Sequence, residues 1–118
     1  MEEDLIKIAE KLGASGHIFY QDRPLGTAHA VLCAEKIMTG SCVIAFADTL
    51  FKSDFNINKS ADGTIWVKQI DDPSSFGVVK LDKDIITDFV EKPDVFVSDL
   101  AIIGIYHVKD SSILKGEI

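Results

Sequence analysis

Three short segments of the 118-residue chain combine side chains and backbone features that can bind anions, hydroxyl groups or cations. The first is the loop from Gln21 to Gly26, a mainly polar run with proline and glycine that leads to Thr27. The second is Asp48, which directly follows an apolar run. The third is Glu91-Lys92-Pro93, in which a carboxylate and an ammonium group are adjacent. Each segment has a ligand-binding and a purely structural interpretation.

The loop before Thr27 is predicted to open a helix. Thr27 stands at an N-cap position, and residues 28–38 are apolar on nearly all sides, which is typical of a buried helix. Free backbone N–H groups and the helix dipole could meet a ligand there, and Gly26 would let a planar group approach closely. The structural alternative is a proline–glycine turn with a threonine cap, and spacing alone favours it.

Asp48 follows residues 41–47, a continuous apolar run that predicts a strand covered on both faces. Open α/β sheets bind ligands beyond the carboxyl ends of their strands. One carboxylate at that place could hold Mg²⁺, which needs one or two protein carboxylates together with substrate phosphates. Asp48 could equally cap the turn at residues 49–51, and its position alone does not decide between the two.

Glu91 and Lys92 end a predicted strand, so their side chains should point to opposite faces. The carboxylate could bind a sugar hydroxyl and the ammonium group a phosphate. The alternative is a solvated pair on an edge strand that Pro93 terminates. Gly77 and Gly104 each lie within a predicted strand, where glycine indicates a bulge or the close approach of a ligand.

The histidine and cysteine side chains give weaker signals. His29 lies in the first turn of the predicted helix without a visible acid or nucleophile partner, and it is predicted to be a helix-surface histidine. Cys33 and Cys42 form no C-x-x-C pair and have no histidines at zinc-ligand spacing. Their pattern predicts reduced thiols and a cytoplasmic protein.

These candidate residues need a scaffold, and the hydrophobic pattern predicts one. The strand–helix–strand order in the first half indicates a parallel α/β core. The second half alternates apolar and polar residues and predicts strands and one hairpin. The predicted helices cover residues 4–12, 28–38 and 111–115, and the predicted strands cover 17–20, 41–47, 63–70, 77–81, 85–90 and 100–108.

Composition bounds the possible functions. A net charge of −7, with 47% hydrophobic and 26% charged residues, predicts one ordinary soluble domain over residues 1–118. Lysines are scattered and Arg23 is the single arginine, so neither a nucleic acid nor a membrane is expected as a partner. The apolar runs are far shorter than the roughly 20 residues of a membrane span. The acidic start is not expected to be a targeting segment.

Five motifs occur in one order over nearly the whole chain. They are Gln21…Pro24-Leu25-Gly26-Thr27-Ala28-His29-Ala30, Ala47-Asp48, Phe76-Gly77-Val78-Val79, Glu91-Lys92-Pro93, and Ser98-Asp99-Leu100-Ala101-Ile102-Ile103-Gly104-Ile105-Tyr106. Together they resemble the sugar-1-phosphate nucleotidylyltransferases, in particular the glucose-1-phosphate thymidylyl- and uridylyltransferases.

The resemblance implies both a fold and a reaction. The implied fold is a partial Rossmann-like nucleotide-diphospho-sugar transferase fold, with a mixed, mostly parallel sheet flanked by helices and a β-hairpin region. The implied reaction joins a nucleoside triphosphate, such as dTTP or UTP, to a sugar 1-phosphate such as glucose 1-phosphate. It releases pyrophosphate and forms a dTDP- or UDP-glucose type of nucleotide sugar.

The resemblance also assigns roles to individual residues. Asp48 would hold the catalytic Mg²⁺, and Lys92 would act in catalysis close to the sugar phosphate. The hexose site would include Gly77, Glu91 and Gly104. In the nucleotide-binding loop, Gln21 and Gly26 would contact the nucleobase, and Pro24 and Thr27 would complete the loop.

The sequence departs from the family pattern in one respect. The glycine-rich loop G-x-G-[ST]-R-L and the later P-K pair are not found, and the second metal-binding aspartate would lie beyond Ile118. We therefore expect a truncated, central portion of the enzyme that is inactive in isolation, and whose incomplete sheet associates into a homo-oligomer. The alternative is a non-catalytic module that binds a nucleotide sugar or serves assembly.

Overall fold

The computed structural model describes residues 1–54 and 56–118 of the chain. The described residues divide into two compact units. The first unit comprises Met1–Met38 and Lys115–Ile118, and the second comprises Thr39–Leu114. All five strands found in the described residues belong to the second unit, so this unit holds the sheet that carries most of the predicted site residues.

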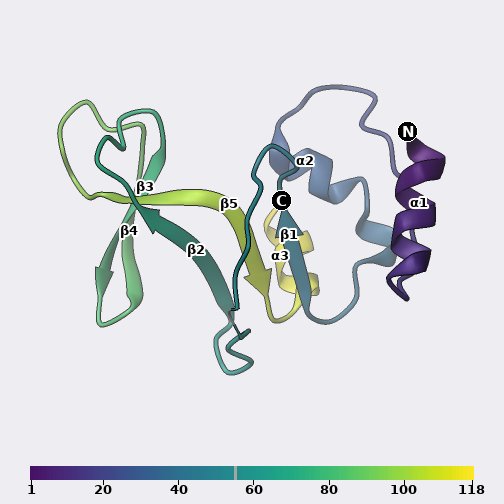
Figure 1. Cartoon of the computed structure of the whole chain (residues 1–118). Helices are drawn as coiled ribbons and strands as arrows, with labels where there is room; N and C mark the ends of the chain where they lie inside the picture. The colour runs from purple at the N-terminus through teal and green to yellow at the C-terminus, as the bar shows by residue number, and fades with distance from the viewer. Residues whose placement is uncertain (55) are drawn as a thin grey trace. The chain divides into compact units, whose positions relative to one another are not determined.

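Helix α1 (Glu2–Lys11) opens the first unit (Figure 1). Its first turn carries three acidic residues and its last turn carries Lys11, an arrangement that complements the helix dipole. Gly13, with a φ angle of 77°, follows the helix in the left-handed region that favours glycine. The predicted helix over residues 4–12 is therefore confirmed, although it begins two residues earlier.

Two expectations for the first unit are wrong. Residues 17–20 form no strand, because a strand requires a hydrogen-bonded neighbour and this short run has none among the described residues. The predicted helix over 28–38 is divided into α2 (Thr27–Leu32) and a 3-10 helix, η1 (Glu35–Ile37). Neither is buried. Threonine, histidine, valine and cysteine are only moderate helix formers, so an apolar composition alone does not sustain a long helix here.

The start of α2 also differs from the expectation. Gly26 occupies the N-cap position with a φ angle of 98°, and Thr27 is already the first helical residue. No side chain caps the helix. The left-handed conformation at Gly26 explains why glycine, and not threonine, stands at the turn into the helix.

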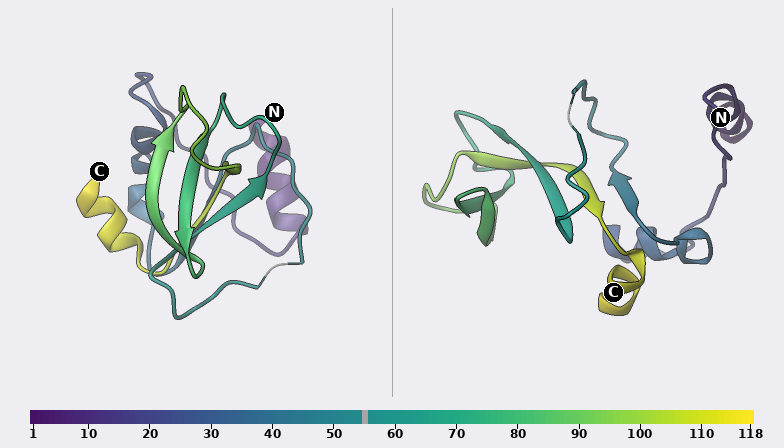
Figure 2. Two further views of the ribbon diagram at one scale, coloured as in Figure 1. Left: turned by 90° about the vertical axis from the view of Figure 1, so that its left-hand side faces the viewer. Right: turned by 90° about the horizontal axis from the view of Figure 1, so that it is seen from below.

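The second unit is built around one antiparallel sheet (Figures 1 and 2). Its long strand β5 (Leu100–Val108) pairs with β1, β2 and β3, and β4 pairs with β3. The hairpin β3–β4 confirms the predicted pair at 77–81 and 85–90, and β5 has the predicted bounds. The other strands are β1 (Cys42–Ala45), β2 (Gly63–Gln69), β3 (Gly77–Asp82) and β4 (Ile85–Glu91).

The expectation of a mostly parallel sheet is wrong for the described residues, because each strand pair among them is antiparallel. A parallel pair needs two strands joined by a crossover. The strand predicted at residues 17–20, which would begin the strand–helix–strand arrangement, does not form. β1 instead pairs with β5, which lies about 60 residues later in the chain.

A bulge in β5 interrupts the sheet at Gly104. Opposite β2, the pairing passes from Tyr106 directly to Ile102, while β2 advances only from Ile65 to Val67. Gly104 lies among the extra residues of β5 between these two pairs, and it has a φ angle of 79°. Because β2 follows one edge of β5, β1 and β3 share the other edge, on either side of this bulge. β1 and β3 therefore diverge there.

The core of the second unit is small and lies in β3 and β5. Val78, Val79, Ala101 and Ile105 are buried. The expectation that β1 is covered on both faces is wrong, since the side chain of Val43 is 50% exposed. Local sequence does not specify which layer covers a strand. Helix α3 (Ser111–Glu117) confirms the predicted helix, and the backbone N–H of its first residue donates to the Gly40 carbonyl at 2.8 Å.

Among residues 1–54 and 56–118, no helix is both long enough and apolar enough to cross a membrane.

Candidate functional site

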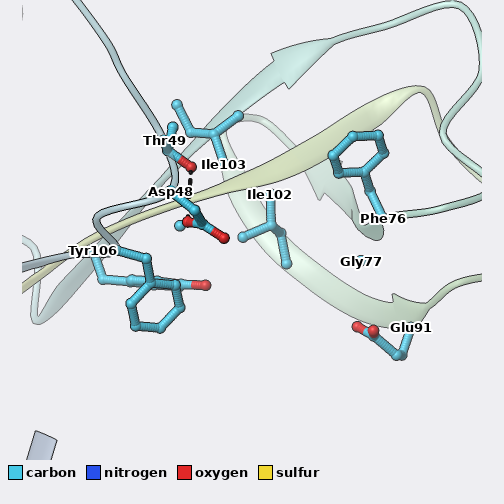
Figure 3. Close-up of a pocket in the computed structure, with 10 residues that line it drawn as sticks. Asp48, Thr49, Phe76, Gly77, Glu91, Ile102, Ile103 and Tyr106 are labelled. Carbon is cyan, nitrogen blue, oxygen red and sulfur yellow. Dashed lines mark hydrogen bonds between the residues drawn. The ribbon is translucent and has the colours of Figure 1, made fainter. Parts of the chain in front are cut away.

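A cavity of about 370 Å³ opens where β1 and β3 diverge from each other beside β5 (Figure 3). Its walls come from the end of β1 and the turn after it, the start of β3, the end of β4 and the middle of β5. Four of the predicted site residues line this one cavity, namely Asp48, Gly77, Glu91 and Gly104. The structure thus brings together residues of four motifs that are separated by up to 56 positions in the sequence.

The two glycines are required by the geometry of the cavity wall. A Cβ atom on Gly77 would lie 2.9 Å from the carboxylate Oε2 of Glu91, which is its register partner across the hairpin. A Cβ atom on Gly104 would lie 3.1 Å from Cδ2 of Phe46, and the φ angle of Gly104 is also positive. Glycine therefore keeps the wall thin at Gly77 and permits the bulge at Gly104.

The charged groups that line the cavity are both carboxylates. Asp48 reaches it from the turn after β1, and Glu91 reaches it from the end of β4. Figure 3 shows Asp48 and Tyr106 on one side of the cavity and Glu91 on the other. The described lining residues include no lysine, arginine or histidine. A cavity with this charge favours hydroxyl donors and cations, and a phosphate would need a cation beside it.

Two aromatic residues of the cavity were not singled out by sequence reasoning. The rings of Phe46 and Tyr106 lie 5.7 Å apart between centroids, tilted by 60°. Burial raises the pKa of the Tyr106 hydroxyl, and the negative charge of Glu91 raises it further. The hydroxyl therefore remains a hydrogen-bond donor. The available signal was the position of Tyr106, two residues after Gly104 in the same strand.

Asp48 offers one carboxylate as an oxygen ligand for a hard cation. Its Oδ1 atom accepts a long hydrogen bond from the Thr49 hydroxyl at 3.5 Å, and the side chain is exposed. Within the described residues, no group of three or more histidine, cysteine or acidic side chains is arranged to hold a metal ion. A single carboxylate fits Mg²⁺ bound mainly by water and by substrate phosphates, and does not fit a closed protein cage.

Lys92 is not among the residues that line the cavity. It follows Glu91 in a left-handed conformation, with a φ angle of 41°. Its backbone N–H donates to the Phe76 carbonyl at 3.1 Å, which continues the hairpin by one hydrogen bond. The structure thus places the Lys92 backbone beside the site, at the end of β4.

The predicted nucleotide-binding loop lies in the first unit and is held by its own hydrogen bonds. The N–H of Leu25 donates to the Arg23 carbonyl at 2.8 Å, which makes a tight turn centred on Pro24. The side-chain Nε2 of Gln21 lies 3.0 Å from the Gly26 carbonyl oxygen and 2.9 Å from Nδ1 of His29. Sequence reasoning treated His29 as a surface residue and missed this contact.

The sequence profile of the nucleotidyl transferase family matches residues 1–116. A mannose-1-phosphate guanylyltransferase catalytic subunit beta of Drosophila pseudoobscura pseudoobscura is 35% identical over 128 residues, covering 100% of this chain and 34% of that protein. A bifunctional protein GlmU of Methanococcus vannielii is 31% identical over 97 residues, covering 76% of this chain and 23% of that protein.

A similar solved structure supports the same relationship. A Bacillus anthracis protein assigned as a glucose-1-phosphate thymidylyltransferase, solved in complex with sucrose, has a TM-score of 0.78 and 26% identity. The match covers 94% of this chain and 48% of that chain. The chain thus spans about a third (34%) of the length of the guanylyltransferase relative. It has the α/β nucleotidyltransferase fold as a partial domain. Since the family profile covers nearly all of its residues, the chain belongs to the nucleotidyl transferase family.

Proposed function

We propose that the chain is a core portion of a sugar-1-phosphate nucleotidyltransferase and contributes its sugar site and part of its metal and nucleotide sites. The observation that carries the proposal is the single cavity lined by Asp48, Gly77, Glu91 and Gly104. In this proposal residues 1–118 belong to one core domain of the enzyme.

The proposed reaction transfers a nucleotidyl group. An oxygen of the sugar 1-phosphate attacks the α-phosphorus of a nucleoside triphosphate and forms a new P–O bond. The bond from the α-phosphorus to the bridging oxygen breaks, and pyrophosphate leaves with that electron pair. Both reactants are anions, so alignment and charge neutralisation matter more than a strong nucleophile.

The residues of the cavity suit this chemistry. Glu91 would accept hydrogen bonds from sugar hydroxyls, and Gly77 and Gly104 would let the sugar ring approach the backbone. Asp48 would hold Mg²⁺, which when bound supplies the positive charge that a phosphate needs beside two carboxylates. Lys92 would supply a further positive charge near the sugar phosphate.

The loop of the first unit would bind the nucleotide. Gln21 and Gly26 would contact the nucleobase, with Pro24 shaping the turn and Thr27 beginning the helix that follows. The relatives' names indicate guanylyl transfer to mannose 1-phosphate in one case and thymidylyl transfer to glucose 1-phosphate in another. We propose glucose 1-phosphate with dTTP or UTP as substrates, and mannose 1-phosphate with GTP as the pair to test against them.

Calorimetric titration tests the proposal. The chain is titrated with dTDP-glucose, UDP-glucose and GDP-mannose, each with and without Mg²⁺. We expect saturable binding of the two pyrimidine sugars, weaker in Glu91→Gln, and a strengthening by Mg²⁺ that is absent in Asp48→Asn. Absence of binding by the folded chain, or binding that both variants leave unchanged, contradicts the proposed sites.

A pair of glycine variants tests the sugar site without removing a charge. Gly77→Ala places a methyl group 2.9 Å from Oε2 of Glu91, so the carboxylate must move and nucleotide-sugar affinity should fall. The matched control is Gly63→Ala in β2, where the nearest atom to the added Cβ is the His107 carbonyl oxygen at 3.6 Å. Equal affinities of the two variants contradict a role for the Glu91 carboxylate.

Catalysis and self-association belong to the same proposal. We expect no pyrophosphate release when the chain alone is mixed with dTTP and glucose 1-phosphate, and measurable release contradicts this.

β1 is a short, uncharged strand whose one strand neighbour among the described residues is β5. We therefore expect a homo-oligomer that Val43→Lys weakens. Sedimentation of the chain as a monomer at high concentration contradicts this expectation.

A further inference from the structure

The neighbours of Gln21 determine the orientation of its side-chain amide. One terminal atom of the amide lies 3.0 Å from the carbonyl oxygen of Gly26. A carbonyl oxygen only accepts hydrogen bonds, so this terminal atom is the donor nitrogen Nε2 and not Oε1. The same carbonyl also accepts the N–H of Ala30 at 3.2 Å, the first hydrogen bond of α2. The helix therefore holds the acceptor that orients the amide.

The second hydrogen of Nε2 determines the tautomer of His29. Nε2 of Gln21 lies 2.9 Å from Nδ1 of His29. Because Nε2 is a donor, Nδ1 must be the acceptor, and the neutral imidazole carries its proton on its own Nε2 atom. His29 is half-buried in the first turn of α2, so its ring is held beside the loop.

The two contacts use both hydrogens of the amide and leave its oxygen available. Among the described residues, none donates to Oε1 of Gln21, and the side chain is exposed. Its sequence neighbours Tyr20 and Asp22 line a hollow of about 290 Å³, together with His29. Gln21 is not itself among the lining residues, but its amide contacts His29, which lines the hollow, and the amide offers a free hydrogen-bond acceptor and no free donor.

We propose that His29 is a positioning residue that makes the chain select nucleobases with a ring N–H donor. This inference rests on the proposed function, in which Gln21 contacts the nucleobase. Uracil, thymine and guanine carry a ring N–H on the edge used for base pairing, whereas cytosine and adenine carry an unprotonated nitrogen at that place. Oε1 of Gln21 accepts from the first group and repels the second. Selection therefore follows the polarity of the base edge and not the size of the ring.

The expected selectivity is moderate because Gln21 is exposed. One neutral hydrogen bond gained or lost in a partly solvated site changes affinity by roughly tenfold. We expect the chain to bind UTP roughly tenfold more tightly than CTP, and GTP more tightly than ATP. In His29→Phe the amide keeps only the Gly26 carbonyl as an acceptor, so its orientation is held less firmly and the ratio of UTP to CTP affinity should fall. His29→Asn, whose Oδ1 takes the place of Nδ1, should restore the preference.

Two measurements on the full chain test this inference. The first is a long-range ¹H–¹⁵N NMR spectrum of the ligand-free chain near neutral pH, which reports the protonated ring nitrogen of His29. The second is calorimetric titration of the chain and both variants with the four triphosphates, with Mg²⁺ present. Dispersed amide signals establish that each variant is folded, and His17→Phe, the same replacement at an exposed histidine that does not line the hollow, serves as the control variant.

The outcomes separate this inference from the proposed function. A proton on Nδ1 of His29 overturns the inference whether or not nucleotides bind. Equal binding of UTP and CTP, or a UTP preference that His29→Phe retains, overturns the inference and leaves the proposed function standing. Absence of binding by all four triphosphates overturns both. A preference that is lost in His29→Phe and kept in His29→Asn and His17→Phe supports the positioning role.

Discussion

Replacing Gly104 by alanine should destabilise the sheet more than the same replacement at Gly63, the glycine of β2. The backbone of Gly104 has a φ angle of 79°, and a left-handed conformation costs a residue with a Cβ atom roughly 1–2 kcal/mol. The added Cβ would also lie 3.1 Å from Cδ2 of Phe46, which must move by a few tenths of an ångström at a cost of roughly 1 kcal/mol. Reduced freedom of the unfolded chain offsets roughly 0.5 kcal/mol. The expected net loss is about 2 kcal/mol.

Urea unfolding followed by tryptophan fluorescence measures this loss, since the single tryptophan, Trp66, lies in β2 beside β5. With a slope of roughly 1–2 kcal/mol per molar urea, the midpoint for Gly104→Ala should fall by about 1–2 M. Gly63→Ala is the control in the same sheet, because its added Cβ meets only the His107 carbonyl oxygen at 3.6 Å. We expect its midpoint to be unchanged or slightly higher. Equal midpoints for the two variants would refute the argument from φ and the Phe46 contact.

Two further predictions concern ionisation and the first unit. In a Tyr20→Phe background, tyrosinate absorbance should show that the pKa of Tyr106 lies above its ordinary value of 10.0, because of burial and then the Glu91 charge, and Glu91→Gln should lower it part of the way. Since the pKa of Tyr106 is higher in the folded state than in the unfolded state, the contribution of this group to folding stability is present below about pH 10 and is lost as pH rises through the folded-state pKa. A Tyr106 titration midpoint that Glu91→Gln leaves unchanged argues against the charge effect. Lys115→Met should lower the free energy of unfolding by about 1 kcal/mol, because Nζ of Lys115 donates to the carbonyls of Met38 at 2.9 Å and Glu35 at 3.4 Å. Thermal unfolding followed by circular dichroism measures this loss, and an equal effect of the exposed-site variant Lys36→Met would contradict it.

The sequence alone predicted the elements whose cause is local. Alternation of apolar and polar residues and a short polar turn predicted the hairpin β3–β4, and β5 was predicted with its observed bounds. The hairpin also explains why Gly77 and Glu91 meet, because a short turn sets their register. The sequence motifs, taken as a resemblance, indicated the family that the profile match later showed.

Only the tertiary structure decided how distant segments meet. The antiparallel pairing of β1 with β5, the bulge at Gly104 and the divergence of β1 from β3 place Asp48 in the same cavity as Glu91. The acceptor role of His29 likewise depends on a loop folding back onto the first turn of α2. Periodicity in a sequence reports which face of an element is apolar. It does not report which strand will supply the hydrogen bonds, because that choice depends on packing between residues far apart in the chain.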